Sequence, residues 1–254
     1  MPVSIESGDM SYGKSPIVET LIDIKTEARS GLSLELLQGF ATSLRDSHPR
    51  TETRFLGQGQ FTFGAEDKAT VERKPFALVL FRADEKQILQ VRTDGLTSSR
   101  LAPYTGWKAL REETSTFWRA YRDFAKPKSV TRLAVRYINQ FIFPGPSVEL
   151  EDYLNTFPEL SRKLPAARRD MISFTMRLTI PQPDLNGFLV ITEGPGNLAP
   201  GAQEVPIVLD LELWVEGLGI MGDDELWSKL EELHERQGVY FEASITDKTR
   251  GLIS

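Results

Sequence analysis

A chain of 254 residues, of which 40% are hydrophobic and 26% charged, is long enough to form a core without a metal or disulfide staple. The absence of cysteine excludes disulfide bonds, a thiolate nucleophile and cysteine metal sites, and it fits a reducing compartment. A net charge of -6 disfavours non-specific binding to nucleic acid, which depends on an excess of Lys and Arg. Because no basic region followed by an apolar stretch and no long apolar run occurs, we expect a cytoplasmic protein without a membrane segment, with a disordered lead over residues 1–15.

The first half of the chain predicts the order strand, helix, three strands, helix. Residues 16–28 alternate apolar and polar side chains with the period of a half-buried strand, and residues 32–46 carry an apolar stripe at helical spacing. Three strands are expected within residues 54–64 and 75–94, because a polar break divides the second segment into a hairpin. Residues 103–127 predict a long helix with an aromatic face.

The second half predicts the same order of elements. Its elements are a strand at 130–144, a short helix at 148–160, strands at 171–182, 185–194 and 205–217, and a last helix at 223–238. We therefore predict an α+β fold of two βαβββα repeats, residues 16–128 and 129–254, whose strands form one long curved antiparallel sheet with the helices packed on one face. This architecture resembles that of the TATA-box binding protein class, a likeness of fold that implies no function.

Charged side chains are expected on the sheet face that the helices leave free, and we call them the charged strip. Its members are Glu19, Asp23, Arg132, Arg136, Asp210 and Glu212. If the opening strands of the two repeats are neighbours near the centre, these residues form cross-strand ion pairs that stabilise the sheet register. In a functional interpretation, Arg132 and Arg136 bind a carboxylate or phosphate. A third interpretation is a metal site made only of carboxylates.

Catalytic and cofactor motifs are absent from the sequence. The two histidines, His48 and His234, are far apart and lack a second histidine at helical spacing, and the glycines of residues 57–64 precede no helix. No serine occurs in a nucleophile elbow. We therefore predict no cofactor and no metal, and we interpret the basic run at 161–169 as a solvated loop.

Six short motifs occur in order over nearly the whole chain from Pro16. They are PIVETLIDI (16–24), SSRLAPYTGW (98–107), RYIN (136–139), LEDYL (150–154), VLDLE (208–212) and LHERQGVYFEASITDKTR (233–250). Together they resemble a sporadically distributed bacterial protein family of about this length. The resemblance implies a bacterial or phage-borne cytoplasmic protein of mobile or defence-associated loci, and it names no substrate. The resemblance also marks five motif positions outside the charged strip, and it assigns no role to them. They are Tyr137, Asn139, His234, Phe241 and Thr246.

These observations favour a non-catalytic protein-binding or regulatory module over an enzyme, of the kind found in antiphage defence or toxin–antitoxin loci. An acidic surface suits a basic partner protein. The alternative is an enzyme that binds a nucleotide or other small anion through Arg132 and Arg136, with Asp23, Asp210 or Glu212 as base or metal ligand. Nucleic-acid binding is disfavoured because the free sheet face has as many acids as bases, and the sequence leaves oligomer formation open.

Overall fold

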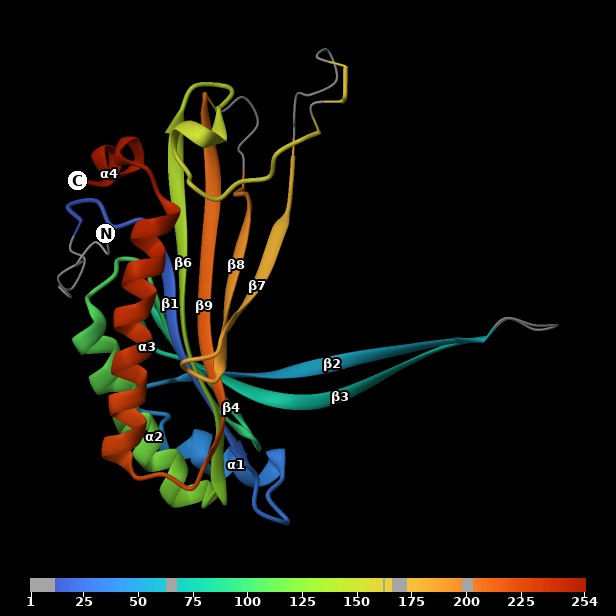
Figure 1. The fold of residues 1–254 in the computed structure, drawn as a ribbon. Coiled ribbons are helices and arrows are strands. Elements are labelled where there is room, and N and C mark those ends of the chain that lie inside the picture. Colours follow the sequence, from blue (N-terminus) through green and yellow to red (C-terminus); the bar gives the residue numbers. More distant parts are fainter. Residues whose placement is uncertain (1–11, 63–67, 162, 166–172, 198–202) are drawn as a thin grey trace.

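The computed structural model describes residues 12–62, 68–161, 163–165, 173–197 and 203–254 (Figure 1). In these residues, nine strands form one antiparallel sheet. The strands are β1 (Ile17–Glu27), β2 (Arg50–Thr62), β3 (Lys68–Phe81), β4 (Gln87–Arg92), β5 (Gly95–Leu101), β6 (Ser129–Pro144), β7 (Met176–Gln182), β8 (Gly187–Pro195) and β9 (Glu204–Gly219). Their order across the sheet is β2-β3-β4-β5-β1-β6-β9-β8-β7. The predicted α+β class with one large antiparallel sheet is confirmed.

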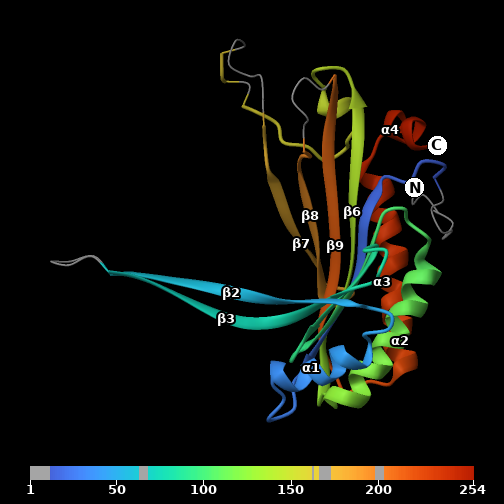
Figure 2. The same cartoon turned by 180° about the vertical axis from the view of Figure 1, so that it is seen from behind.

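The helices of the described residues are α1 (Leu34–Ser43), α2 (Trp107–Ala125), α3 (Asp223–Ser244) and α4 (Asp247–Ile253). Helix α1 packs against β3 and β4, α2 against β5 and β1, and α3 against β6 and β9 (Figures 1 and 2). They cover one face of the sheet, as predicted. We call the opposite face the free face.

The core lies between the sheet and this helix layer. Ile22 and Ile24 of β1 lie opposite Val135 and Leu133 of β6, and all four side chains are buried. The buried members of the stripe predicted on α2 are Trp107, Leu110, Thr114, Trp118 and Tyr121. Burying apolar area on one face of strands and helices is the main favourable contribution to such a fold.

The opening strands of the two halves, β1 and β6, are antiparallel neighbours at the centre of the sheet. The sequence predicted this adjacency from the assumed repeat. Outwards from the centre, each half continues with its last strand and then its earlier strands, in the order β5-β4-β3-β2 on one side and β9-β8-β7 on the other. The internal duplication itself stays a prediction, because the two halves differ in their elements.

The first half contains four strands after its helix, where the sequence predicted three. The missed strand is β5, a segment rich in Ser and Thr that lacks an apolar alternation. It pairs with β4 across a two-residue turn that ends at Gly95. Gly95 has φ +136, and a Cβ there would lie 2.0 Å from the carbonyl oxygen of Ile24, so only glycine lets the turn lie this close to β1.

The second half also departs from the predicted order. The short helix expected at 148–160 is a single 3-10 turn, Leu150–Asp152, and the final helix is followed by α4. The predicted disordered lead was expected to end at residue 15, but contacts with the folded body begin earlier. Tyr12 donates a hydrogen bond to Glu242. Residues 1–11, the rest of the predicted disordered lead, lie outside the described residues.

Strands β2 and β3 extend beyond the sheet as a long hairpin, which projects to the side opposite α2 and α3 (Figures 1 and 2). We call residues 50–62 and 68–75 the β2–β3 arm. Every described side chain of β2 is exposed, and β3 becomes buried only from Ala77 onwards. Strand β2 is also one edge of the sheet. The described side chains of the arm at residues 50–57, 59 and 72–75 are therefore exposed on both faces.

Candidate functional site

Three members of the charged strip, Asp23, Arg132 and Glu212, form a hydrogen-bonded row on the free face with Arg92 of β4 and Thr97 of β5, across the neighbouring strands β4, β5, β1, β6 and β9. Asp23 Oδ1 accepts from Arg92 Nη2 at 2.7 Å and from Thr97 Oγ1 at 2.6 Å, and its Oδ2 accepts from Arg132 Nη1 at 3.0 Å. Arg132 Nη2 then donates to Glu212 Oε1 at 2.5 Å. Asp23 is only 10% exposed, so this row is more protected from solvent than an ordinary surface ion pair.

Arg136 and Asp210 form a second pair, one step along β6 and β9. The guanidinium donates from Nε and Nη2 to the two carboxylate oxygens, at 2.7 and 2.5 Å. These hydrogen bonds raise the pKa of Arg136, and the negative charge of Glu19 adds to the effect. Such two-point contacts between guanidinium and carboxylate are among the strong hydrogen bonds of proteins.

All six members of the strip are thus close together on the free face, as the sequence predicted. Both arginines are already bound to carboxylates of the same chain, and an incoming anion would have to displace Asp23, Glu212 or Asp210. The geometry favours the ion-pair interpretation, in which the strip stabilises the sheet register. It adds no support for the alternative of an anion-binding enzyme.

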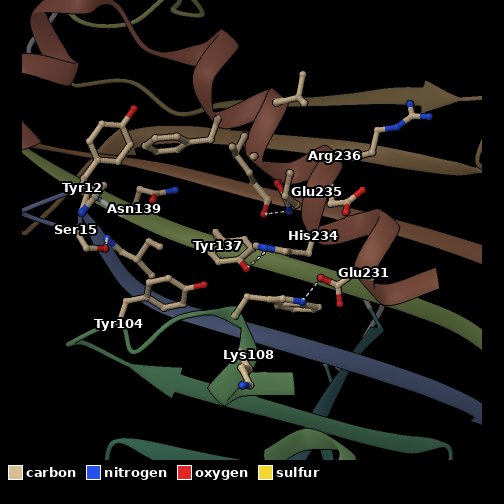
Figure 3. Close-up of a pocket in the computed structure, with 18 of the residues that line it drawn as sticks. Tyr12, Ser15, Tyr104, Lys108, Tyr137, Asn139, Glu231, His234, Glu235 and Arg236 are labelled. Carbon is tan, nitrogen blue, oxygen red and sulfur yellow. Dashed lines mark hydrogen bonds between the residues drawn. The ribbon is translucent and has the colours of Figure 1, made fainter. Parts of the chain in front are cut away.

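A cavity of about 610 Å³ lies on the other side of the sheet, between α3, the start of α2 and the strands β1 and β6 (Figure 3). Its walls include Tyr137, Asn139, His234 and Phe241, four of the motif positions to which the sequence gave no role. The RYIN motif places Tyr137 and Asn139 two residues apart on one face of a strand. Motifs that are about 100 residues apart in the chain therefore lie together at this cavity.

Aromatic rings form most of the cavity wall. The rings of Trp107 and His234 stack with their centroids 4.4 Å apart and 11° between their planes. Tyr104 meets Tyr137 edge to face at 6.0 Å, and Tyr137 Oη lies 2.9 Å from His234 Nδ1 (Figure 3). These contacts connect rings from α2, α3, β6 and the segment before α2.

The mouth of the cavity is closed on one side by Tyr12, whose ring lies 6.1 Å from that of Phe241. Burial and the hydrogen bond to Glu242 raise the pKa of Tyr12 to about 12, so its phenol stays protonated at physiological pH. The remaining motif position, Thr246, lies outside the cavity. It caps α4 by accepting from Thr249 N and donates to the carbonyl oxygen of Asp152, which is a structural role.

Two buried amides line the cavity next to the sheet. Gln237 Nε2 donates to the carbonyl oxygens of Val135 and Leu211, at 2.8 and 2.7 Å, and Asn139 Nδ2 donates to that of Leu209 at 3.1 Å. Sequence reasoning missed Gln237. Its position three residues after His234, on the same face of a helix, was the available signal.

The chain matches no protein-family model, no curated protein and no solved structure. The resemblance to a bacterial family and the likeness to the TATA-box binding protein class stay predictions.

Glu193 is a second residue that sequence reasoning missed. It lies in β8 on the helix side of the sheet, between Met176 and Leu209 of the neighbouring strands, and is 1% exposed. Neither of its carboxylate oxygens has a hydrogen-bond partner in the described part of the chain. Burial raises its pKa from the ordinary value of 4.5 to about 8.

The described residues also bear on the metal and membrane expectations. Among them, no group of three or more His, Asp or Glu side chains is placed to hold a metal ion. No helix in the same residues has the length and apolar composition needed to cross a bilayer. Of the predicted basic loop, Arg162, Arg168 and Arg169 lie outside the described residues.

Proposed function

We propose that this protein is a non-catalytic protein-binding module and that the β2–β3 arm is its binding element. In this proposal, a strand of the partner protein pairs along the outer edge of β2, as peptides add to exposed sheet edges elsewhere. The observation that carries the proposal is the arm itself, a long hairpin that projects from the body and whose described side chains are exposed on both faces.

The edge strand β2 is long and free of proline, and its charged residues and its register shift lie at or before Phe55, which leaves residues 56–62 as the edge for pairing. Proteins blunt exposed edges with short strands or proline, and the other edge of this sheet, β7, is short and contains Pro181. Strand β2 has 13 residues and no proline. A two-stranded ribbon is only marginally stable in water, so a third strand from a partner would stabilise the arm.

The exposed side chains of the arm supply apolar contacts. Phe55 and Leu56 are 53% and 61% exposed, whereas charges near them are partly compensated within the arm, as in the ion pair between Lys74 and Glu72. Exposed aromatic and aliphatic residues commonly anchor protein interfaces. The motif resemblance supports a setting in the bacterial cytoplasm, in a defence or toxin–antitoxin locus.

The test is affinity purification of the tagged protein from its host, comparing wild type with the double variant Phe55→Ser, Leu56→Ser. Both side chains are exposed, so we expect the fold to be retained and the stability to change little. The expected result is a stoichiometric protein partner whose recovery, measured by mass spectrometry, falls at least about tenfold in the variant. The matched control is Ile220→Ser, an apolar residue that is 89% exposed but distant in sequence from the arm.

Equal recovery of the partner with the arm variant and the control would contradict the proposal. Light scattering of the purified protein provides a second comparison. A dimer of this chain that dissociates in the arm variant would mean that the partner is a second copy, and it would overturn the proposal of a different protein.

A further inference from the structure

We propose that the cavity between α3 and the sheet binds a small planar nitrogen heterocycle, which donates an N–H group to Gln237. This inference is independent of the proposed function, because the cavity lies on the helix side of the sheet and the arm projects from the other side (Figures 1 and 3).

The size and lining of the cavity fit a small molecule. Ligand sites in proteins are concave, mostly apolar, and have volumes of about 300–1,000 Å³ with a few polar groups that fix orientation. The cavity of about 610 Å³ has this composition, with aromatic walls and two buried amides. The volume exceeds the space that isolated waters need by more than an order of magnitude.

The orientation of the Gln237 amide is fixed by its two contacts to the sheet. Its Nε2 lies within hydrogen-bond distance of two carbonyl oxygens, which only an N–H donor can satisfy. Its Oε1 must therefore be the remaining atom, and this oxygen is buried without a partner among the described residues. A buried acceptor left without a donor destabilises the protein, and a ligand with a donor would remove this cost.

Asn139 of β6 lines the same cavity and is 1% exposed. Its Nδ2 donates to the carbonyl oxygen of Leu209, which orients the amide. Gln237 uses both N–H groups of Nε2 on the sheet backbone, so the complementary ligand presents a donor to its Oε1.

The ring arrangement favours a flat ligand. The stacked pair Trp107 and His234 forms one wall, and the edge-to-face pair Tyr104 and Tyr137 meets it through the contact between Tyr137 and His234 (Figure 3). Aromatic side chains bind planar rings by offset stacking or edge contacts and also attract cations over their faces.

The charges of the lining are balanced. Glu231, Glu232 and Glu235 of α3 line the cavity, together with the cations Lys108 and Arg236. Arg236 donates to Asp184, and Glu231 and Glu232 form ion pairs with Arg111 and Lys229, all of them partners outside the lining. The wall therefore has no excess of either charge, and recognition rests on the rings and the buried amide acceptor.

The test compares two bicyclic probes of similar size, 2-aminobenzimidazole and 2-naphthoate, by titration calorimetry and ligand-observed NMR on the full chain. The first probe has ring N–H donors and can carry a positive charge, whereas the second has no donor and is an anion. We expect saturable binding of 2-aminobenzimidazole with a Kd below about 1 mM and at least tenfold weaker binding of 2-naphthoate.

Two variants place the binding in the cavity. Val239→Trp fills the mouth from an exposed helix position, and we expect it to weaken binding of 2-aminobenzimidazole at least about tenfold. Its control is Leu252→Trp, an exposed position of α4 outside the lining, which should leave the Kd unchanged. Gln237→Met removes the acceptor and should weaken binding about fivefold, provided that circular dichroism shows an intact fold.

The absence of saturable binding, or equal affinity for the two probes, would overturn the inference. So would equal effects of Val239→Trp and Leu252→Trp. If Gln237→Met fails to fold, the two tryptophan variants and the probe pair decide the question without it.

Discussion

Replacement of Glu193 by glutamine is expected to stabilise the protein at neutral pH, because wild type pays to keep this carboxyl group buried. The folded-state pKa of about 8 exceeds the unfolded value of 4.5, so the native state binds more protons than the unfolded state between these two values. Stability due to this group is therefore intact below about pH 4.5 and is lost as the pH rises towards 8. Glutamine removes the titration, and we expect a gain of about 3 kcal/mol at pH 7.

The measurement is urea unfolding of wild type and Glu193→Gln at several values from about pH 5 to pH 8, over which the difference in unfolding free energy should widen with pH. Glu204→Gln, at the exposed start of β9, is the matched control for removing a carboxylate from a strand. A difference between wild type and Glu193→Gln that stays the same over this range would show that Glu193 is not the buried neutral acid described here.

Replacement of Arg132 by methionine is expected to destabilise the protein by about 2–3 kcal/mol, because it leaves Glu212 without its partner and Asp23 with one guanidinium fewer. Breaking a fully buried pair costs about 3–5 kcal/mol, and the smaller value reflects the 18% exposure of the Arg132 side chain. Urea unfolding at neutral pH measures the change directly.

Lys128→Met provides the comparison for this variant. Lys128 donates to Glu27 at 2.9 Å, but both side chains are 54% exposed. Pairs in solvent contribute little because water and salt screen them, so the unfolding midpoint should hardly move. If Arg132→Met behaved like Lys128→Met, the row on the free face would not be a stabilising element. That outcome would favour an anion-binding role for Arg132.

Several features of the fold were predictable from the sequence because local pattern and tertiary environment agree. The apolar period in residues 17–27 and the stripe from Trp107 to Tyr121 describe elements that bury one face only. The same alternation placed Asp23, Arg132 and Glu212 on the other face, and the adjacency of β1 and β6 then brought them together.

Other features depend on contacts that no local pattern contains. Strand β5 forms because it lies between β1 and β4, which supply partners for a polar segment, although the Asp94-Gly95 pair was a usable turn signal. The environment of Glu193 is set by strands that come before and after it in the chain, so the local sequence contains no sign that this glutamate is buried. The cavity likewise needs α2, α3 and β6 together.

The central position of β1 also affects how the chain can fold during synthesis. The first strand to leave the ribosome pairs on both of its edges with later strands, since Ile22 pairs with Ser98 in β5 and with Val135 in β6. At translation rates of about 5–20 residues per second, β1 waits several seconds for its first partner. Throughout that interval an apolar strand with two free edges is exposed on the nascent chain, which makes this segment vulnerable to aggregation when translation is slow.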